Sequence, residues 1–101
     1  MRLTEKEIKA ICEAFREHFA PGDKLYLFGS RVDDSKRGGD IDLFIQTHET
    51  DYDITFQNKI RFTVDLKIRI GDQKIDVVIQ SPGRNLPIYD EALKTGIVLY
   101  E

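Results

Sequence analysis

The stretch "LFGSRVDDSKRGGDIDLFI", residues 27–45, holds the side chains of this sequence that could do chemistry together. Gly29 and Ser30 end one apolar run, and Asp40 and Asp42 stand one residue apart at the start of the next. Side chains at i and i+2 of a strand point the same way, with Cβ atoms about 7 Å apart. Two carboxylates buried together without a countercharge are unfavourable. The pair therefore either lies exposed at a strand start or shares a divalent cation.

Oxygen ligands from aspartate suit Mg²⁺, which completes its coordination shell with phosphate oxygens and water. The Gly29 turn would let backbone N–H groups approach a phosphate closely, and Ser30 would add a hydroxyl donor. A helix starting there would add its positive end. Arg31, Lys36 and Arg37 place positive charge in the same loop. A Gly-Ser turn or an Asp-x-Asp strand end alone is common and needs no ligand, but their conjunction predicts a site for a metal-bound polyphosphate.

Three short apolar runs bounded by turn residues predict the strands that position these side chains. They cover residues 24–29, 40–46 and 74–80. The period of two puts Asp40 and Asp42 on one face of the second strand, and Asp76 on one face of the third. A hydrophobic tail, "IVLYE" at 97–101, is consistent with a last short strand.

Two helices are also indicated. Thr4 and Glu7 form a capping box, and apolar residues then recur at three- and four-residue steps until Pro21 and Gly22 end the helix. Cys12 lies on that apolar face and is interpreted as a small core residue. The segment 87–96 begins with proline and ends with glycine, which predicts a short final helix.

The segment 54–70 fits two structures. Apolar residues alternate from Ile60 to Ile70, which favours a strand. The same residues also align at four-residue steps, as in a helix with an apolar surface over more than half of its circumference. Patterning alone favours the strand.

The bulk composition predicts one domain spanning residues 1–101. With 41% hydrophobic and 33% charged residues the chain is typical of globular proteins. The net charge of −3 argues against broad nucleic-acid binding, and the single cysteine excludes an internal disulfide. No signal-peptide core and no membrane-spanning run is seen, so a cytoplasmic location is expected. His18 and His48 have no metal-ligand neighbours in the sequence and are interpreted as surface residues.

The sequence resembles the minimal nucleotidyltransferases of the polymerase-β-like superfamily, whose signature is Gly-Ser, a spacer, Asp-x-Asp, and a third Asp on a later strand. The resemblance runs from "LYLFGSR" through "GGDIDLFI" and "GDQKIDVVI" to "EALKTGIVLYE", nearly the whole chain. It is strongest to the antitoxins encoded beside HEPN-domain toxins. The spacer, Arg31 to Gly39, is one residue shorter than is usual in the family.

The resemblance implies an α/β (α+β) fold in which a small mixed sheet packs against helices. It favours Asp76 over Asp65 as the third carboxylate, and it makes 54–70 mainly helical, against the alternation. Asp40, Asp42 and Asp76 would then be the catalytic residues and would hold two Mg²⁺ ions. Gly29, Ser30 and Arg31 would bind the phosphates of ATP, the substrate.

The resemblance also supplies an acceptor, which this short chain has little room to bind alone. Antitoxins of this type transfer AMP from ATP to a tyrosine of a HEPN ribonuclease toxin, and such a toxin is the expected partner. Two other functions stay open: neutralisation of the toxin by binding without catalysis, and nucleotidyl transfer to a small molecule such as an antibiotic. The tail residues 97–100 and the apolar surface of 54–70 are expected at the partner interface or, equally, in the core or a homo-oligomer contact.

Overall fold

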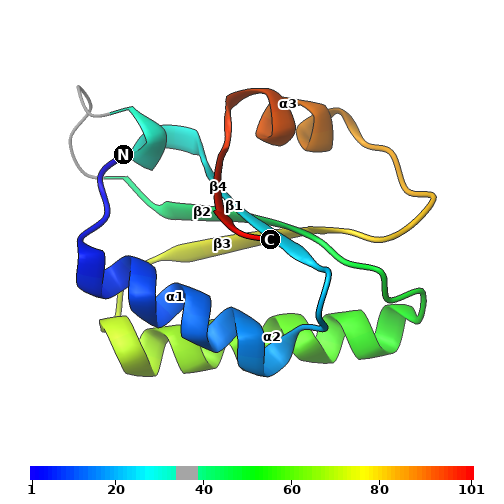
Figure 1. Ribbon diagram of the computed structural model, residues 1–101, viewed down its shortest axis with the longest axis horizontal. Coiled ribbons are helices and arrows are strands. Elements are labelled where there is room, and N and C mark those ends of the chain that lie inside the picture. The colour runs from blue at the N-terminus through cyan, green and yellow to red at the C-terminus, as the bar shows by residue number, and fades with distance from the viewer. Residues whose placement is uncertain (34–38) are drawn as a thin grey trace.

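The computed structural model describes residues 1–33 and 39–101, and these form one four-stranded sheet with helices on both faces (Figure 1). The elements follow in the order α1 (Glu5–His18), β1 (Lys24–Phe28), η1 (Gly29–Val32), β2 (Ile41–Gln46), α2 (Tyr52–Ile70), β3 (Ile75–Gln80), α3 (Pro87–Thr95) and β4 (Ile97–Tyr100).

The sheet is mixed, with the strand order β3-β2-β1-β4. β1 pairs antiparallel with both β2 and β4, whereas β2 and β3 run parallel because α2 crosses over between them. β3 and β4 are the two edge strands. The predicted α/β fold with a small mixed sheet is confirmed.

The two faces of the sheet are covered unequally. In Figure 1 α1 and α2 lie together below the sheet and α3 lies above it. The larger core is formed between the sheet and the helix pair, and its fully buried side chains include Ile11, Phe15, Leu25, Leu27, Ile41, Leu43, Ile45, Phe62 and Leu66. A smaller cluster joins α3 to the other face and contains Tyr26, Phe28, Phe44, Tyr89 and Ala92. The aspartates lie on this second face.

Helix α1 begins as its sequence predicts. Glu7 N–H donates to Thr4 Oγ1 at 3.0 Å, and Thr4 N–H donates to Glu7 Oε1 at 2.9 Å, so both halves of the capping box are present. The predicted core position of Cys12 is half-buried, and its Sγ lies 3.4 Å from the Leu99 carbonyl oxygen that accepts from it. Burial raises the pKa of this thiol, which favours the unreactive protonated form.

Segment 54–70 is helical, as the family resemblance implies and against the alternation. Helix α2 begins two residues earlier than expected because the Asp51 carboxylate accepts from the N–H groups of Asp53 and Ile54. The alternating apolar residues separate into two rows at four-residue steps. Phe62 and Leu66 are buried against α1 and the sheet, whereas the row that contains Ile60, Val64 and Ile68 is exposed.

None of the helices in the described ranges, 1–33 and 39–101, is both long and apolar enough to cross a membrane.

Candidate functional site

The parallel pairing of β2 and β3 brings two of the predicted carboxylates together. Asp42 and Asp76 are direct neighbours in the register, and adjacent strands lie about 4.8 Å apart. Both side chains belong to the face that α3 covers, because Asp42 alternates with Leu43 of the larger core and shares its face with Phe44. Residues distant in the sequence thus form one acidic pair at the end of the sheet where β2 begins.

Asp42 lies among other negative charges at this site. Burial raises the pKa of the Asp42 carboxyl, and the negative charges of Asp76 and Asp40 raise it further. A hydrogen bond with Asp76 acts in the same direction. Like charges held at this spacing are stabilised when a positive charge lies between them.

Asp40 lies one residue before β2 and forms an ion pair with Lys74, which lies one residue before β3. The Lys74 Nζ and Asp40 Oδ2 atoms are 3.3 Å apart. The hydrogen bond to Asp40 raises the pKa of Lys74, as do the nearby charges of Asp76 and Asp42. Lys74 is therefore a cation at this acidic site, and sequence reasoning missed it. The signal was its place directly before the Asp76 strand.

Gly29 is required by the close approach of β1 to Asp42. Phe28, the residue before it, is the register neighbour of Asp42 on the other side. The glycine has φ of +76°, which side chains rarely tolerate, and a Cβ built on it would overlap Asp42 Oδ2 and lie 3.0 Å from Asp42 Cγ. The predicted glycine turn thus packs directly against the acidic pair.

The two other predicted phosphate-binding residues follow in η1, a short 3₁₀ helix. Ser30 is its second residue. Arg31 donates from Nη1 to the Arg2 carbonyl at 2.9 Å, and its other nitrogens lie 3.4 Å from acceptors on Gly39 and Gln73. These bonds tie the N-terminus to the site region, so phosphate binding by Arg31 stays a prediction. Lys36 and Arg37, also predicted to add positive charge, lie outside the described residues.

The donor set suits a hard divalent cation. Asp40, Asp42 and Asp76 offer carboxylate oxygens only, which Mg²⁺ prefers. Asp42 and Asp76 already lie side by side, whereas Asp40 is engaged by Lys74. Binding of Mg²⁺ by all three would require Asp40 to exchange its ammonium partner for the metal.

An open groove of about 520 Å³ leads from this pair to the free edge of β3. Asp42 and Asp76 lie in its wall, with Ile88 of α3 on one side and Lys59 and Thr63 of α2 on the other. The acidic pair is therefore accessible from the side of β3.

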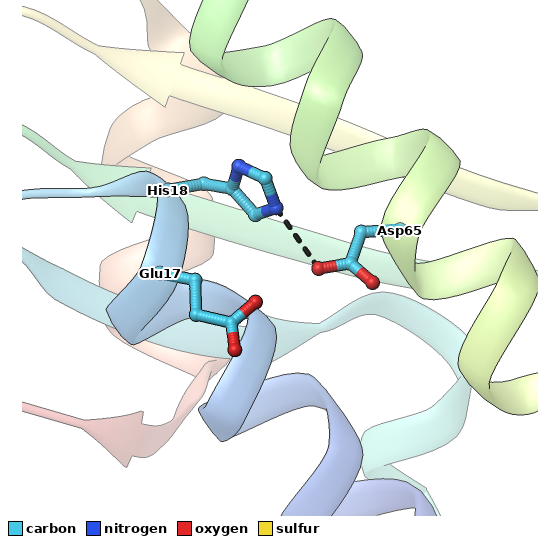
Figure 2. A group of neighbouring side chains, drawn as sticks. All are labelled: Glu17, His18 and Asp65. Carbon is cyan, nitrogen blue, oxygen red and sulfur yellow. Dashed lines mark hydrogen bonds and ion pairs between the residues drawn. The ribbon is translucent and has the colours of Figure 1, made fainter.

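Asp65, the rejected candidate for the third carboxylate, lies elsewhere. It is on α2, and His18 Nε2 lies 2.9 Å from its Oδ2. Figure 2 shows Glu17 and His18 of α1 and Asp65 of α2 pointing toward one another. Within the described part of the chain, these three form the one group of His, Cys, Asp or Glu side chains whose ligand atoms all lie within 4.8 Å of one another.

An arginine already pairs with both carboxylates of that group. Arg69 contacts Asp65 at 2.9 Å and Glu17 at 2.7 Å, and it also pairs with Glu13. The hydrogen bond from Arg69 is the main cause that lowers the pKa of the Asp65 carboxyl. The group therefore functions as an ion-pair clamp between α1 and α2, which pack against each other.

The interpretation of the histidines as surface residues needs correction for His18. Its side chain is half-buried and it does have carboxylate neighbours, because α1 and α2 pack with these side chains at their contact. His48 is exposed, as predicted, although its Nδ1 lies 3.0 Å from Oδ1 of the buried Asp23. Neither histidine lies beside Asp42.

Comparison with known proteins agrees with this geometry. A search of curated proteins found no match. The profile of one family, described as polymerase beta, nucleotidyltransferase, matches residues 6–101. Since this match spans nearly all of the chain, the protein belongs to the polymerase-β nucleotidyltransferase family, whose general reaction is nucleotidyl transfer.

Proposed function

We propose that this protein is an antitoxin that transfers AMP from ATP to a tyrosine hydroxyl of a cognate HEPN ribonuclease toxin and thereby silences it. Nucleotidyl transfer follows from the family. The observation that carries the catalytic part of the proposal is the register of Asp42 beside Asp76, next to the Gly29 turn. The antitoxin part rests on the resemblance to antitoxins of this type.

In this proposal Asp40, Asp42 and Asp76 hold two Mg²⁺ ions, and Gly29, Ser30 and Arg31 bind the ATP phosphates. When bound, the metal ions would neutralise phosphate charge and favour ionisation of the attacking hydroxyl. Asp76 lies at the β3 side of the site, where the groove opens. That position suits a carboxylate that accepts the proton of an incoming hydroxyl group.

The reaction is an in-line displacement at the α-phosphorus of ATP. The tyrosine oxygen forms a bond to that phosphorus, and the bond from the phosphorus to the β-phosphate bridging oxygen breaks. Pyrophosphate leaves with the bonding electron pair, and the tyrosine proton passes to Asp76 and then to solvent. The protein side chains hold the groups in line and are unchanged at the end.

A row of exposed apolar residues on α2 supports association with a partner protein. Tyr52, Phe56, Ile60, Val64 and Ile68 follow one another at four-residue steps along the helix, and Ile68 is 77% exposed. Such a row forms a ridge that can pack into the groove of another helix. The tail, by contrast, is β4, in which Leu99 and Tyr100 pack against the larger core and Val98 is exposed. We therefore assign the partner surface to α2 rather than to the tail.

The decisive experiment uses the product of the neighbouring gene, which the proposal expects to be a HEPN-domain protein. That protein is incubated with this one, ATP and Mg²⁺, and its intact mass is measured before peptide mapping. We expect added mass equal to whole AMP units, located on a tyrosine, and no addition with the Asp76→Asn variant.

Each other outcome selects a different function. A stable complex without added mass, at saturating ATP, would mean neutralisation by binding alone. Neither complex nor added mass would refute the antitoxin proposal and leave a nucleotidyltransferase that acts on another acceptor, such as a small molecule.

A further inference from the structure

The free edge of β3 forms the floor of a groove that is longer than the site. The hollow beside Asp76 includes the consecutive residues Ile75, Asp76, Val77 and Val78. A second hollow of about 170 Å³ continues past Ile79 and Ser81 between α2 and α3. Lys59 lines both hollows, so together they follow the strand from the acidic pair toward Arg84.

Part of the backbone along this edge is available for pairing. Ile41 N–H donates to the Lys74 carbonyl and Thr47 N–H to the Gln80 carbonyl, so the even-numbered residues of β3 turn their backbone groups toward β2. The odd-numbered residues turn theirs outward. The Ile79 carbonyl accepts from the Tyr89 hydroxyl at 3.2 Å, whereas the backbone of Val77 has no such bond within residues 1–33 and 39–101.

An unpaired strand edge with side-chain pockets beside it is the arrangement that binds extended peptides by strand addition. A strand paired with β3 would lie about 4.8 Å from it, on the side opposite β2. Asp42, Asp76 and one residue of the added strand would then stand in a row across three adjacent strands. A hydroxyl side chain in that row would reach the carboxylates of the site.

The charges along the groove differ between its two ends. The Asp42 and Asp76 end repels acidic side chains. Lys59 and Arg84 lie farther along, and neither forms an ion pair within the described part of the chain. A matching segment therefore carries its hydroxyl residue at one end and acidic residues at the other.

We propose that the acceptor is presented as an extended segment paired with the free edge of β3, with its hydroxyl residue beside Asp76 and acidic residues beside Lys59 and Arg84. This inference rests on the proposed function, because it names how the acceptor of that transfer is held. The hydroxyl oxygen attacks the α-phosphorus of ATP, pyrophosphate leaves, and the hydroxyl proton passes to Asp76.

Two synthetic peptides test the inference in both strand directions: acetyl-Val-Tyr-Val-Val-Glu-Glu-amide and acetyl-Glu-Glu-Val-Val-Tyr-Val-amide. Each is added to isotope-labelled protein, and amide hydrogen exchange is followed by NMR. We expect one of them to slow exchange at the Val77 amide by about tenfold or more, while the Val78 amide, already turned to β2, changes little. Versions with alternate N-methylated amides keep every side chain and should not bind.

A matched pair of charge reversals tests the groove itself. Lys59→Glu should weaken peptide binding by roughly fivefold, because a charge at the rim of the groove is reversed. Lys67→Glu makes the same change on the same helix outside the groove, and it should leave binding within about twofold. Equal effects of both variants would overturn the inference, as would equal binding of the N-methylated peptides or no binding of either peptide.

AMP transfer to the HEPN-domain protein, measured in parallel, separates the two proposals. Transfer without protection of Val77 by either peptide would refute edge pairing and leave the proposed function intact. Protection of Val77 without any transfer would refute the proposed function and support the groove as a peptide-binding site.

Discussion

Substitution of Gly29 by alanine should damage both the fold and the acidic pair, for two separable reasons. At φ of +76° an alanine is strained, at a cost of roughly 1–2 kcal/mol. The new Cβ also overlaps the Asp42 carboxylate, and forced repacking of this kind costs about 1–3 kcal/mol. We expect a total loss of about 2–5 kcal/mol in unfolding free energy, or on the order of 10–30 °C in Tm for a domain of this size.

Gly83→Ala is the matched control. Gly83 has a nearly equal φ of +79°, but nothing lies within 4 Å of a Cβ added there. It should therefore lose only the backbone part, about 1–2 kcal/mol. The difference between the two variants measures the contact of Gly29 with Asp42.

The contact can also be isolated by a double-mutant cycle in urea, followed by circular dichroism without metal. In an Asp42→Ala background the overlapping carboxylate is gone and only its Cβ, 3.2 Å from the added atom, remains. Gly29→Ala should then cost little more than Gly83→Ala, which gives a coupling energy of about 1–3 kcal/mol. A coupling energy below about 0.5 kcal/mol, the limit of additivity, would refute the reasoning that Gly29 is needed because Asp42 lies against it.

Three further predictions concern individual side chains. Asp42→Asn should abolish transfer yet raise Tm near pH 7 in the absence of metal, because the raised pKa of Asp42 destabilises the folded wild type only while this carboxyl is ionised. The gain in Tm should therefore disappear as pH falls toward the ordinary carboxyl value of 3.8. A gain that grows on acidification in thermal scans would contradict this prediction. Asp76→Asn should abolish transfer with little change in circular dichroism. Asp65→Asn should keep transfer but lower Tm by a few degrees, because the bonds of Asp65 to Arg69 and His18 are lost. The opposite pattern in mass-based transfer assays would exclude Asp76 as the third carboxylate. Ile68→Glu should separate the complex with the HEPN-domain protein in size-exclusion chromatography. It should not lower the Tm of the free protein, because this side chain is 77% exposed. Co-elution as for wild type would show that α2 is not part of the interface.

Most elements were predictable because their signals are local. The strands observed at Lys24–Phe28, Ile41–Gln46 and Ile75–Gln80 each begin or end within one residue of the predicted range. A turn residue bounds each run, and local backbone preference decides where pairing stops. The capping box fixed the start of α1 in the same way.

Helix α2 shows where local patterning fails. The buried row of apolar residues alone has the spacing of a helix. The exposed row adds apolar residues between them, so the whole segment shows the alternation that is typical of a strand. Periodicity assumes that apolar side chains lie on the inner face only, and α2 violates that assumption along its whole length. A functional surface is a sufficient reason for such a violation.

The sequence predicts which two residues form the acidic pair, but not that their side chains lie next to each other. Asp42 and Asp76 become neighbours only because β2 and β3 pair in parallel, in register and side by side, and no local signal specifies that pairing. The aspartates themselves are like charges and oppose it. What fixes it is the other face of the same strands, where Ile41, Leu43, Ile75 and Val77 are buried. A slip of one residue would turn Asp76 toward that core and expose its apolar neighbours. The larger core therefore sets the position of a pair of charges that would not otherwise approach each other, and in the proposed function a phosphate-bound metal would relieve the repulsion that the core imposes.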